Sequence, residues 1–170
     1  MNYQKQYKIP FSGLSENIHH FEFKIDDKFF ENFEFSEIKK SNINVYLTLE
    51  KQERMLIFEF LIEGTVNIMC DRCLEFFDYP INGKEKLIVK FGNENYEGTD
   101  DILIIPETEN EIDISKYIYE FICLLLPIKR IHPEDENGNS QCNKEMIKKI
   151  KEFSKKKISD GRWDELKKII

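Results

Sequence analysis

A C-x-x-C motif, Cys70-Asp71-Arg72-Cys73, is the clearest chemical signal in the sequence. His132 and Cys142 follow far downstream and would complete a ligand set with the spacing Cys-x2-Cys-x58-His-x9-Cys. Thiolates and an imidazole are the donors of tetrahedral zinc sites, and four protein ligands leave no open position for water. The pattern therefore predicts a structural zinc site that joins the downstream segment to the C-x-x-C turn.

Two other interpretations of these residues stay open. The cysteines are ordinary reduced thiols in the first, and a thioredoxin-like redox pair in the second, although such a pair sits near a βαβ pattern that is not visible here. Cys123 lies in an apolar helical stretch and is expected to pack in the core. His19 and His20 are neighbours in a predicted strand, so their rings face opposite sides and are poorly placed to share a metal.

The sequence lacks a recognisable catalytic motif: it has no Gly-rich phosphate loop, no G-x-S-x-G and no spaced carboxylate pair with a plausible partner. We therefore expect a protein without enzymatic activity. The composition, 41% hydrophobic and 34% charged, is typical of a soluble globular chain. The longest apolar run, 121–126, ends at Pro127 and is too short to span a membrane. We expect a cytoplasmic protein with no membrane contact and no secretory signal.

Alternating apolar and polar residues fill most of the first two thirds of the chain, and this period is typical of strands. The predicted strands are 7–11, 18–25, 43–49, 56–62, 65–69, 76–81, 86–91 and 102–105. Neighbouring strands joined by short turns favour an antiparallel arrangement. The predicted fold class is α+β, mainly an antiparallel β meander or a partly open barrel, with one long apolar helix and C-terminal amphipathic helices.

Helical spacing marks the remaining elements. A short helix is expected within 26–33, and the apolar stripe of 114–126 predicts the long helix, which Pro127 ends. A second stripe, from Met146 to Ile158, lies among lysines, and 162–169 predicts a last short helix. The predicted organisation is a mixed antiparallel β domain over 1–142, with the C-x-x-C hairpin and helix 114–126, and a basic amphipathic helical tail over 143–170.

Charge divides the chain unevenly. The net charge is −7, yet residues 144–170 hold 10 Lys/Arg against 5 Asp/Glu. A basic tail can contact nucleic-acid phosphates, although a solvated helix face explains the same pattern. Trp163, the only tryptophan, docks the tail onto the body or anchors a partner. The candidate contact residues are Lys148, Lys149, Lys151, Lys155, Lys156, Lys157 and Trp163.

Three segments, taken in order, resemble the YceD family of large ribosomal RNA subunit accumulation proteins. The first is Cys70-Asp71-Arg72-Cys73-Leu74 with the aromatic strand that follows it. The second runs from Ile112 through the apolar helix to Leu125-Leu126-Pro127-Ile128-Lys129-Arg130-Ile131-His132. The third is Cys142 followed by Arg162-Trp163-Asp164-Glu165-Leu166. The resemblance covers most of 7–170, and its specificity lies in the order of the motifs.

The resemblance implies a cytoplasmic, non-enzymatic protein needed for normal levels of large-subunit ribosomal RNA. The implied partners are a ribosomal RNA precursor or a ribosomal protein, and no catalytic residue carries over. The residues that transfer are Cys70, Cys73, His132 and Cys142, as a structural cluster. The alternative function is a zinc-stapled protein–protein interaction module that does not bind nucleic acid.

Overall fold

The structure, a computed structural model, describes residues 6–92 and 102–155. These residues form two compact units: the first combines 6–68, 76–92 and 102–128, and the second combines 69–75 and 129–155. The predicted division of the chain into 1–142 and 143–170 stays a prediction.

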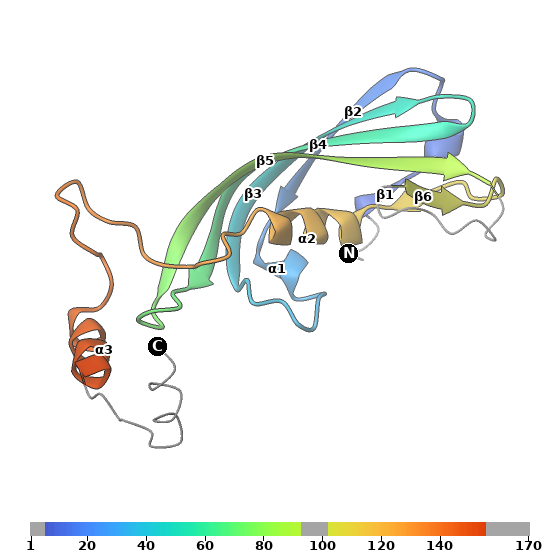
Figure 1. Cartoon of the computed structure of the whole chain (residues 1–170). Coiled ribbons are helices and arrows are strands. Elements are labelled where there is room, and N and C mark those ends of the chain that lie inside the picture. Colours follow the sequence, from blue (N-terminus) through green and yellow to red (C-terminus); the bar gives the residue numbers. More distant parts are fainter. Residues whose placement is uncertain (1–5, 93–101, 156–170) are drawn as a thin grey trace, which may run out of the picture. The chain divides into compact units, whose positions relative to one another are not determined.

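A five-stranded sheet organises the first unit, in the spatial order β2-β3-β4-β5-β6 (Figure 1). Its strands are β2 (Ile18–Ile25), β3 (Lys40–Lys51), β4 (Met55–Met69), β5 (Phe76–Phe91) and β6 (Ile102–Ile105). Strands that follow one another in the sequence lie side by side, as is usual in small sheets. The predicted α+β class and the mainly antiparallel sheet are confirmed.

The pairing of the strands shows where the sheet departs from a simple meander. β2 and β3 are antiparallel, with Phe21 opposite Leu47, and β3 and β4 are antiparallel, with Val45 opposite Ile62. β6 instead runs parallel to β5, with Ile88 beside Ile102. The sheet is therefore mixed, and β2 and β6 form its edges.

Alternation along the long strands separates a buried face of the sheet from an outer face, as the period of two requires. The buried side chains of β3 and β4 are Ile43, Val45, Leu47, Leu49, Leu56, Phe58, Phe60 and Ile62. Two pairs of predicted strands, 56–62 with 65–69 and 76–81 with 86–91, prove to be the single continuous strands β4 and β5.

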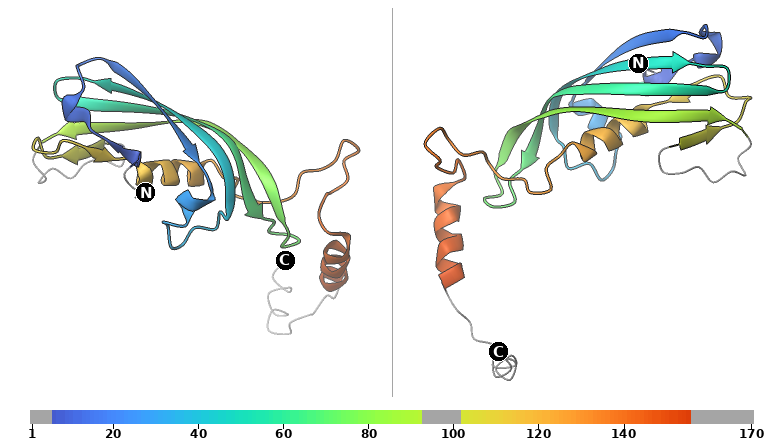
Figure 2. Two further views of the ribbon diagram at one scale, coloured as in Figure 1. Left: turned by 180° about the vertical axis from the view of Figure 1, so that it is seen from behind. Right: turned by 45° about the horizontal axis from the view of Figure 1, so that its top comes forward.

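Two helices, α1 (Asp27–Phe30) and α2 (Ser115–Leu124), lie on the concave side of this curved sheet (Figures 1 and 2). Phe121 of α2 meets Phe60 of β4 edge to face, with ring centroids 5.1 Å apart. Tyr119 of α2 stacks on Phe33, just after α1, at 4.0 Å. Aromatic contacts therefore hold both helices in the core of the first unit.

A two-stranded sheet pairs the start of the chain with the segment before α2. β1 (Lys8–Ile9) is antiparallel to β7 (Ile112–Asp113), with Ile9 opposite Ile112. The strand predicted over 7–11 is shorter than expected because Pro10, which has no N–H to donate, interrupts it. A 3-10 turn, η2 (Phe11–Gly13), follows.

The prediction of one long apolar helix over 114–126 was wrong. α2 has 10 residues, and its buried side chains are Ile118 and Ile122. Ile114 is the N-cap, with φ −95° and ψ 0°, and Leu125 is the C-cap. Pro127 disfavours helical geometry in the residue before it, so the apolar residues Leu125 and Leu126 do not extend the helix. Leu124, the last residue of α2, is 71% exposed.

The second unit consists of the turn 69–75, an extended segment with a loop, and the helix α3 (Lys144–Lys155). Asn143 caps α3, since its side-chain Oδ1 accepts the backbone N–H groups of Glu145 (2.9 Å) and Met146 (3.2 Å). This confirms one predicted C-terminal amphipathic helix; the other, over 162–169, lies outside the described residues. Among the helices that the structure describes, none is long and apolar enough to cross a membrane.

Candidate metal centre

The Cys70–Glu75 turn, which connects β4 to β5, presents the first two candidate ligands. The N–H of Cys70 donates to the carbonyl oxygen of Glu75 (2.9 Å), and the N–H of Leu74 donates to the carbonyl oxygen of Cys70 (2.9 Å). Leu74 has a φ of 62°, in the left-handed region that non-glycine residues rarely adopt. This tight turn places the thiols of Cys70 and Cys73 in the same small space, and both residues are buried.

Asp71 fastens the downstream segment to this turn. Its N–H donates to the carbonyl oxygen of Arg130 (2.7 Å), and its carboxylate accepts the N–H of Arg130 (2.8 Å). This reciprocal pair holds the backbone two residues before His132. This role of Asp71 could not be predicted, because nothing local in the sequence connects residue 71 with residue 130.

The loop that separates His132 from Cys142 is closed by its own hydrogen bonds. The N–H of Gln141 donates to the carbonyl oxygen of Pro133 (3.3 Å), and the Asp135 carboxylate accepts the N–H groups of Asn137 (2.9 Å) and Asn139 (2.7 Å). These bonds hold the pKa of Asp135 below its usual value, against a small effect of burial. The nine residues between His132 and Cys142 thus form a compact loop that returns the chain to the cluster.

The structure brings all four predicted ligands together. The ligand atoms of Cys70, Cys73, His132 and Cys142 lie within 4.8 Å of one another. The Sγ atoms of Cys70 and Cys142 are 3.7 Å apart, and Nδ1 of His132 is 3.4 Å from Sγ of Cys73 and 3.8 Å from Sγ of Cys142. The set combines one imidazole with three thiols. All three cysteines, Cys70, Cys73 and Cys142, are buried.

These separations fit a tetrahedral metal. With Zn–S bonds of about 2.3 Å and a tetrahedral angle, two sulfur ligands lie roughly 3.8 Å apart, and a sulfur and an imidazole nitrogen roughly 3.6 Å apart. The observed distances of 3.4–3.8 Å scatter around those values. The donor set and the distances therefore suit one metal ion held by four protein ligands.

The electrostatics of the cluster favour a thiolate at Cys70. Burial raises the pKa of this thiol, but the backbone N–H groups of Cys73, Arg72 and His132 and the His132 side chain outweigh burial and hold the pKa at about 6. Burial raises the pKa of Cys142, as do the neighbouring thiols, against a hydrogen bond from Ser140. A cation would satisfy both groups, because metals bind the thiolate form.

Cys123 lies on α2 and is not part of this cluster. It is partly exposed, so the prediction that it packs in the core is not confirmed. The predicted orientation of the histidine pair fits β2, in which His19 and His20 fall on alternate faces of the strand. Nδ1 of His20 lies 3.2 Å from the hydroxyl of Thr48, and Nε2 of His19 lies 2.9 Å from the carbonyl oxygen of Ser15.

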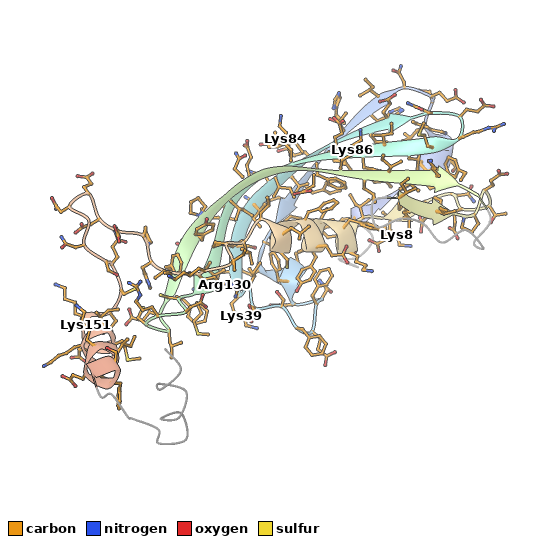
Figure 3. All side chains as sticks on the ribbon, viewed as in Figure 1. Lys8, Lys39, Lys84, Lys86, Arg130 and Lys151 are labelled. Carbon is orange, nitrogen blue, oxygen red and sulfur yellow. The ribbon has the colours of Figure 1, made fainter. Side chains whose placement is uncertain are left out.

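The predicted contact residues fall partly within the structure. Lys148, Lys149 and Lys151 are exposed on α3, and Lys151 extends from the helix into solvent (Figure 3). The backbone of Lys155 ends α3, while its side chain lies outside the described part, as do Lys156, Lys157 and Trp163. Their contact roles stay predictions.

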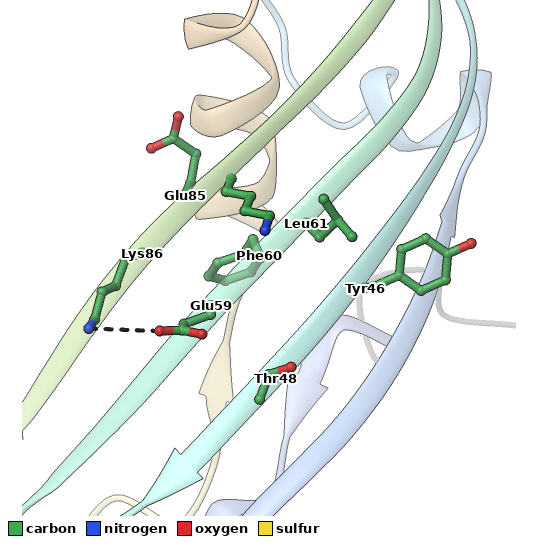
Figure 4. Close-up of a pocket in the computed structure, with 8 residues that line it drawn as sticks. Tyr46, Thr48, Glu59, Phe60, Leu61, Glu85 and Lys86 are labelled. Carbon is green, nitrogen blue, oxygen red and sulfur yellow. Dashed lines mark ion pairs between the residues drawn. The ribbon is translucent and has the colours of Figure 1, made fainter.

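A hollow of about 620 Å³ lies on the outer face of the sheet, over β3, β4 and β5 (Figure 4). Tyr46 stands 40% exposed at its edge. Nζ of Lys86 lies 3.9 Å from the carboxylate of Glu59, and both side chains are more than half exposed. Such a surface ion pair is weak. Because the lining also contains Lys84 and Glu85, the positive and negative charges of the hollow cancel.

The two units differ in charge. The described residues of the first unit include 18 Asp/Glu and 11 Lys/Arg, whereas those of the second include 7 Asp/Glu and 8 Lys/Arg. A polyanion is therefore repelled by the first unit and not by the second. Lys84 and Lys86 of the first unit project from one side of β5 (Figure 3).

The part of the chain that contains the cluster is similar to a known protein family. The model of a family described as "Large ribosomal RNA subunit accumulation protein YceD" matches residues 58–170, more than half of the chain. The chain belongs to the YceD family. The matched region of this YceD-family chain includes all four cluster residues and α3. No curated protein and no solved structure matched the chain.

Proposed function

We propose that this chain is a non-enzymatic factor that supports the accumulation of large-subunit ribosomal RNA, by binding the RNA precursor or a ribosomal protein on it. The observation that carries the proposal is the family match over 58–170, which the family's name connects with large-subunit RNA. The contrast in charge between the two units supports it, because a ribonucleoprotein precursor presents both phosphates and basic proteins.

The Cys/His cluster has a structural role in this proposal: it holds one zinc ion. Three thiolates and an imidazole are a common donor set of structural zinc sites. When bound, the ion would link the Cys70–Glu75 turn to the start of α3, since Cys142 is followed by the cap residue Asn143. Asn143 also donates from its side-chain amide to the carboxylate of Glu75 (2.6 Å), which supports the same connection.

The function is tested by depletion of the protein and by fractionation of lysate. Depletion should lower the ratio of large-subunit to small-subunit ribosomal RNA, and re-expression should restore it. In a sucrose gradient, the protein should migrate with large-subunit precursors at low salt and leave them at high salt, as an electrostatic contact requires. An unchanged RNA ratio on depletion would contradict the proposal.

A second candidate function is a zinc-stapled protein–protein interaction module without nucleic-acid contact. The outer hollow favours it, because Tyr46 offers an exposed aromatic ring between charged side chains. In this case, partner capture by the purified protein would survive nuclease treatment. The protein would also stay at the top of the gradient at both salt concentrations.

A further inference from the structure

The lysines of α3 are not spread evenly around the helix. With 3.6 residues per turn, positions 144, 148 and 151 fall within about 60° of one another around the helix axis and span about 10 Å along it. Lys144, Lys148 and Lys151 are all exposed. We call these three residues the lysine stripe.

The apolar and acidic residues of α3 occupy other sectors of the helix. Met146, Ile150 and Phe153 lie on the side away from the stripe, while Glu145 and Glu152 lie between the stripe and Lys149. Lys149 itself is about 100° from Lys148 around the axis. Of the α3 lysines whose side chains the structure describes, three lie in the stripe and one, Lys149, lies beyond the glutamates.

A hollow of about 480 Å³ runs along the stripe. Its lining consists of Ser140, Cys142, Lys144, Ile147, Lys148, Lys151 and Glu152. The surface is therefore concave, carries three positive charges against one negative charge, and borders a residue of the candidate metal centre. The positive end of the helix dipole, at the Asn143 cap, adds to the potential beside Lys144.

The lysines of the stripe form no ion pair within the described part of the chain, so an internal ion pair does not explain their alignment. Among the described residues, the ion pairs are Lys8–Glu111, Lys86–Glu59 and Lys116–Glu120, and none of them includes a lysine of α3. Like charges four residues apart destabilise a helix. Three aligned ammonium groups beside a hollow are instead suited to a ligand with regularly repeated negative charges, and lysine binds phosphate as a point charge.

We propose that Lys144, Lys148 and Lys151, with the hollow that they line beside Cys142, bind successive phosphates of an RNA strand. This rests on the proposed function and deepens it, since it assigns the RNA contact to one side of α3. It also changes the set of predicted contact residues on α3. Lys144 joins the residues that contact phosphate, and Lys149 is excluded from them.

The test compares Lys148→Gln with Lys149→Gln in the full-length, metal-loaded chain. Both variants remove one exposed charge from the same helix, so that general electrostatics and helix propensity are matched. The probe is fluorescein-labelled polyuridylate, titrated over a series of salt concentrations. Circular dichroism and metal content should equal those of the unmodified protein in both variants.

The stripe should determine the salt dependence. Lys148→Gln should weaken binding several-fold at low salt and lower the slope of log K against log salt by about 0.7, the value for one phosphate contact on a single strand. The triple variant K144Q/K148Q/K151Q should lower the slope by about 2. Lys149→Gln should leave the slope unchanged. Equal effects of Lys148→Gln and Lys149→Gln would overturn the proposal.

A competition experiment separates RNA from an acidic protein as the partner. Polyglutamate at matched charge should displace the labelled RNA far less well than unlabelled polyuridylate does. Equal displacement would assign the stripe to an acidic protein and refute the phosphate site. If the unmodified protein fails to bind RNA while depletion still lowers the ribosomal RNA ratio, this inference fails and the proposed function stands. If RNA binding depends on the stripe but depletion leaves the ribosomal RNA ratio unchanged, this inference stands and the proposed function fails.

Discussion

The Sγ atom of Cys70 lies 3.7 Å from the Sγ atom of Cys142, although 72 positions separate the two residues. This distance is far longer than a disulfide bond, at about 2.05 Å, and suits two ligands of one metal ion. A metal at this point would bind only the folded chain, because the unfolded chain does not hold these four distant ligands together. The stability of the second unit should therefore depend on metal.

The first prediction concerns Cys142, the last ligand in the sequence. Cys142→Ser should reduce the metal content of the protein, measured by elemental analysis after purification without added metal, from about one ion per chain to a small fraction. The melting temperature should fall by roughly 5–10 °C, because a structural metal stabilises only the folded state.

Cys123→Ser is the matched control for this experiment. It makes the same chemical change at a partly exposed cysteine outside the cluster, and should leave the metal content unchanged. If purified protein is metal-free, folded and insensitive to a chelator, the cluster is a group of reduced thiols and the zinc assignment is wrong.

The second prediction concerns Asp71, which fixes the backbone near His132 without being a ligand. Asp71→Ala removes the acceptor for the N–H of Arg130. Substitution of residues that orient metal ligands typically lowers metal affinity 10–100-fold. We expect at least a tenfold loss, measured by competition with a chromophoric chelator. Asp71→Asn, which keeps an acceptor oxygen, should recover most of this affinity.

Asp78→Ala is the control for Asp71. Its carboxylate accepts the side-chain amide of Asn67 (2.7 Å), and Asp78 is not one of the four candidate ligands. This variant should bind metal as the unmodified protein does. Equal losses of metal affinity in Asp71→Ala and Asp78→Ala would show that Asp71 acts only through general stability.

Features that depend on residue type or on neighbouring residues were predictable from the sequence, whereas contacts between distant segments were not. Residue types alone identified the cluster, because cysteine and histidine are the usual ligands of zinc and can be recognised in any sequence. Alternation predicted β2 over 18–25 correctly, since a one-face-buried strand has a period of two. The contact between Asp71 and Arg130 and the pairing of β1 with β7 were not predictable, because they depend on register between distant segments.

The apolar stretch before Pro127 shows a different kind of failure. Helical spacing continues through Leu125, yet α2 ends at Leu124, because local backbone preference next to proline overrides the apolar pattern. The cap at Asn143, by contrast, had a readable signal: an asparagine immediately before an amphipathic stripe. The sector arrangement of the α3 lysines was also available from the helical period, once the helix boundary was known.

The third prediction concerns Gly64 in β4, where the close approach of two strands requires glycine. Gly64 has a φ of 156°, and a Cβ at this position would lie 2.6 Å from Cα of Ile43, its register partner on β3. Gly64→Ala should lower the free energy of unfolding by about 1–3 kcal/mol, measured by denaturant titration, because backbone atoms cannot move aside cheaply.

Gly13→Ala is the control for the glycine substitution, since a Cβ there would meet nothing within 4 Å. Its effect on the free energy of unfolding should be small. A loss at Gly13 that matches the loss at Gly64 would attribute the effect to the general entropy of glycine and not to the contact between β3 and β4.

The fourth prediction concerns Tyr119, whose ring stacks on Phe33 with centroids 4.0 Å apart. Burial raises the pKa of this phenol, and the neighbouring Cys123 and Glu37 add to the rise against a hydrogen bond from Ser36. The folded state thus disfavours the phenolate more than the unfolded state does. The stabilising contribution is complete below the unfolded pKa, about 10, and is lost as the pH rises through the higher folded pKa.

Unfolding titrations at increasing alkaline pH test this prediction. The unmodified protein should lose stability above about pH 10, and Tyr119→Phe, which keeps the ring stack but cannot ionise, should lose less over the same range. Ultraviolet absorbance should show one tyrosinate fewer in the late part of the titration of the variant. Because Tyr117 also has a raised pKa, from burial and Glu120, part of the late titration should remain. Identical alkaline profiles for the two proteins would show that the Tyr119 phenol is not held neutral by the core.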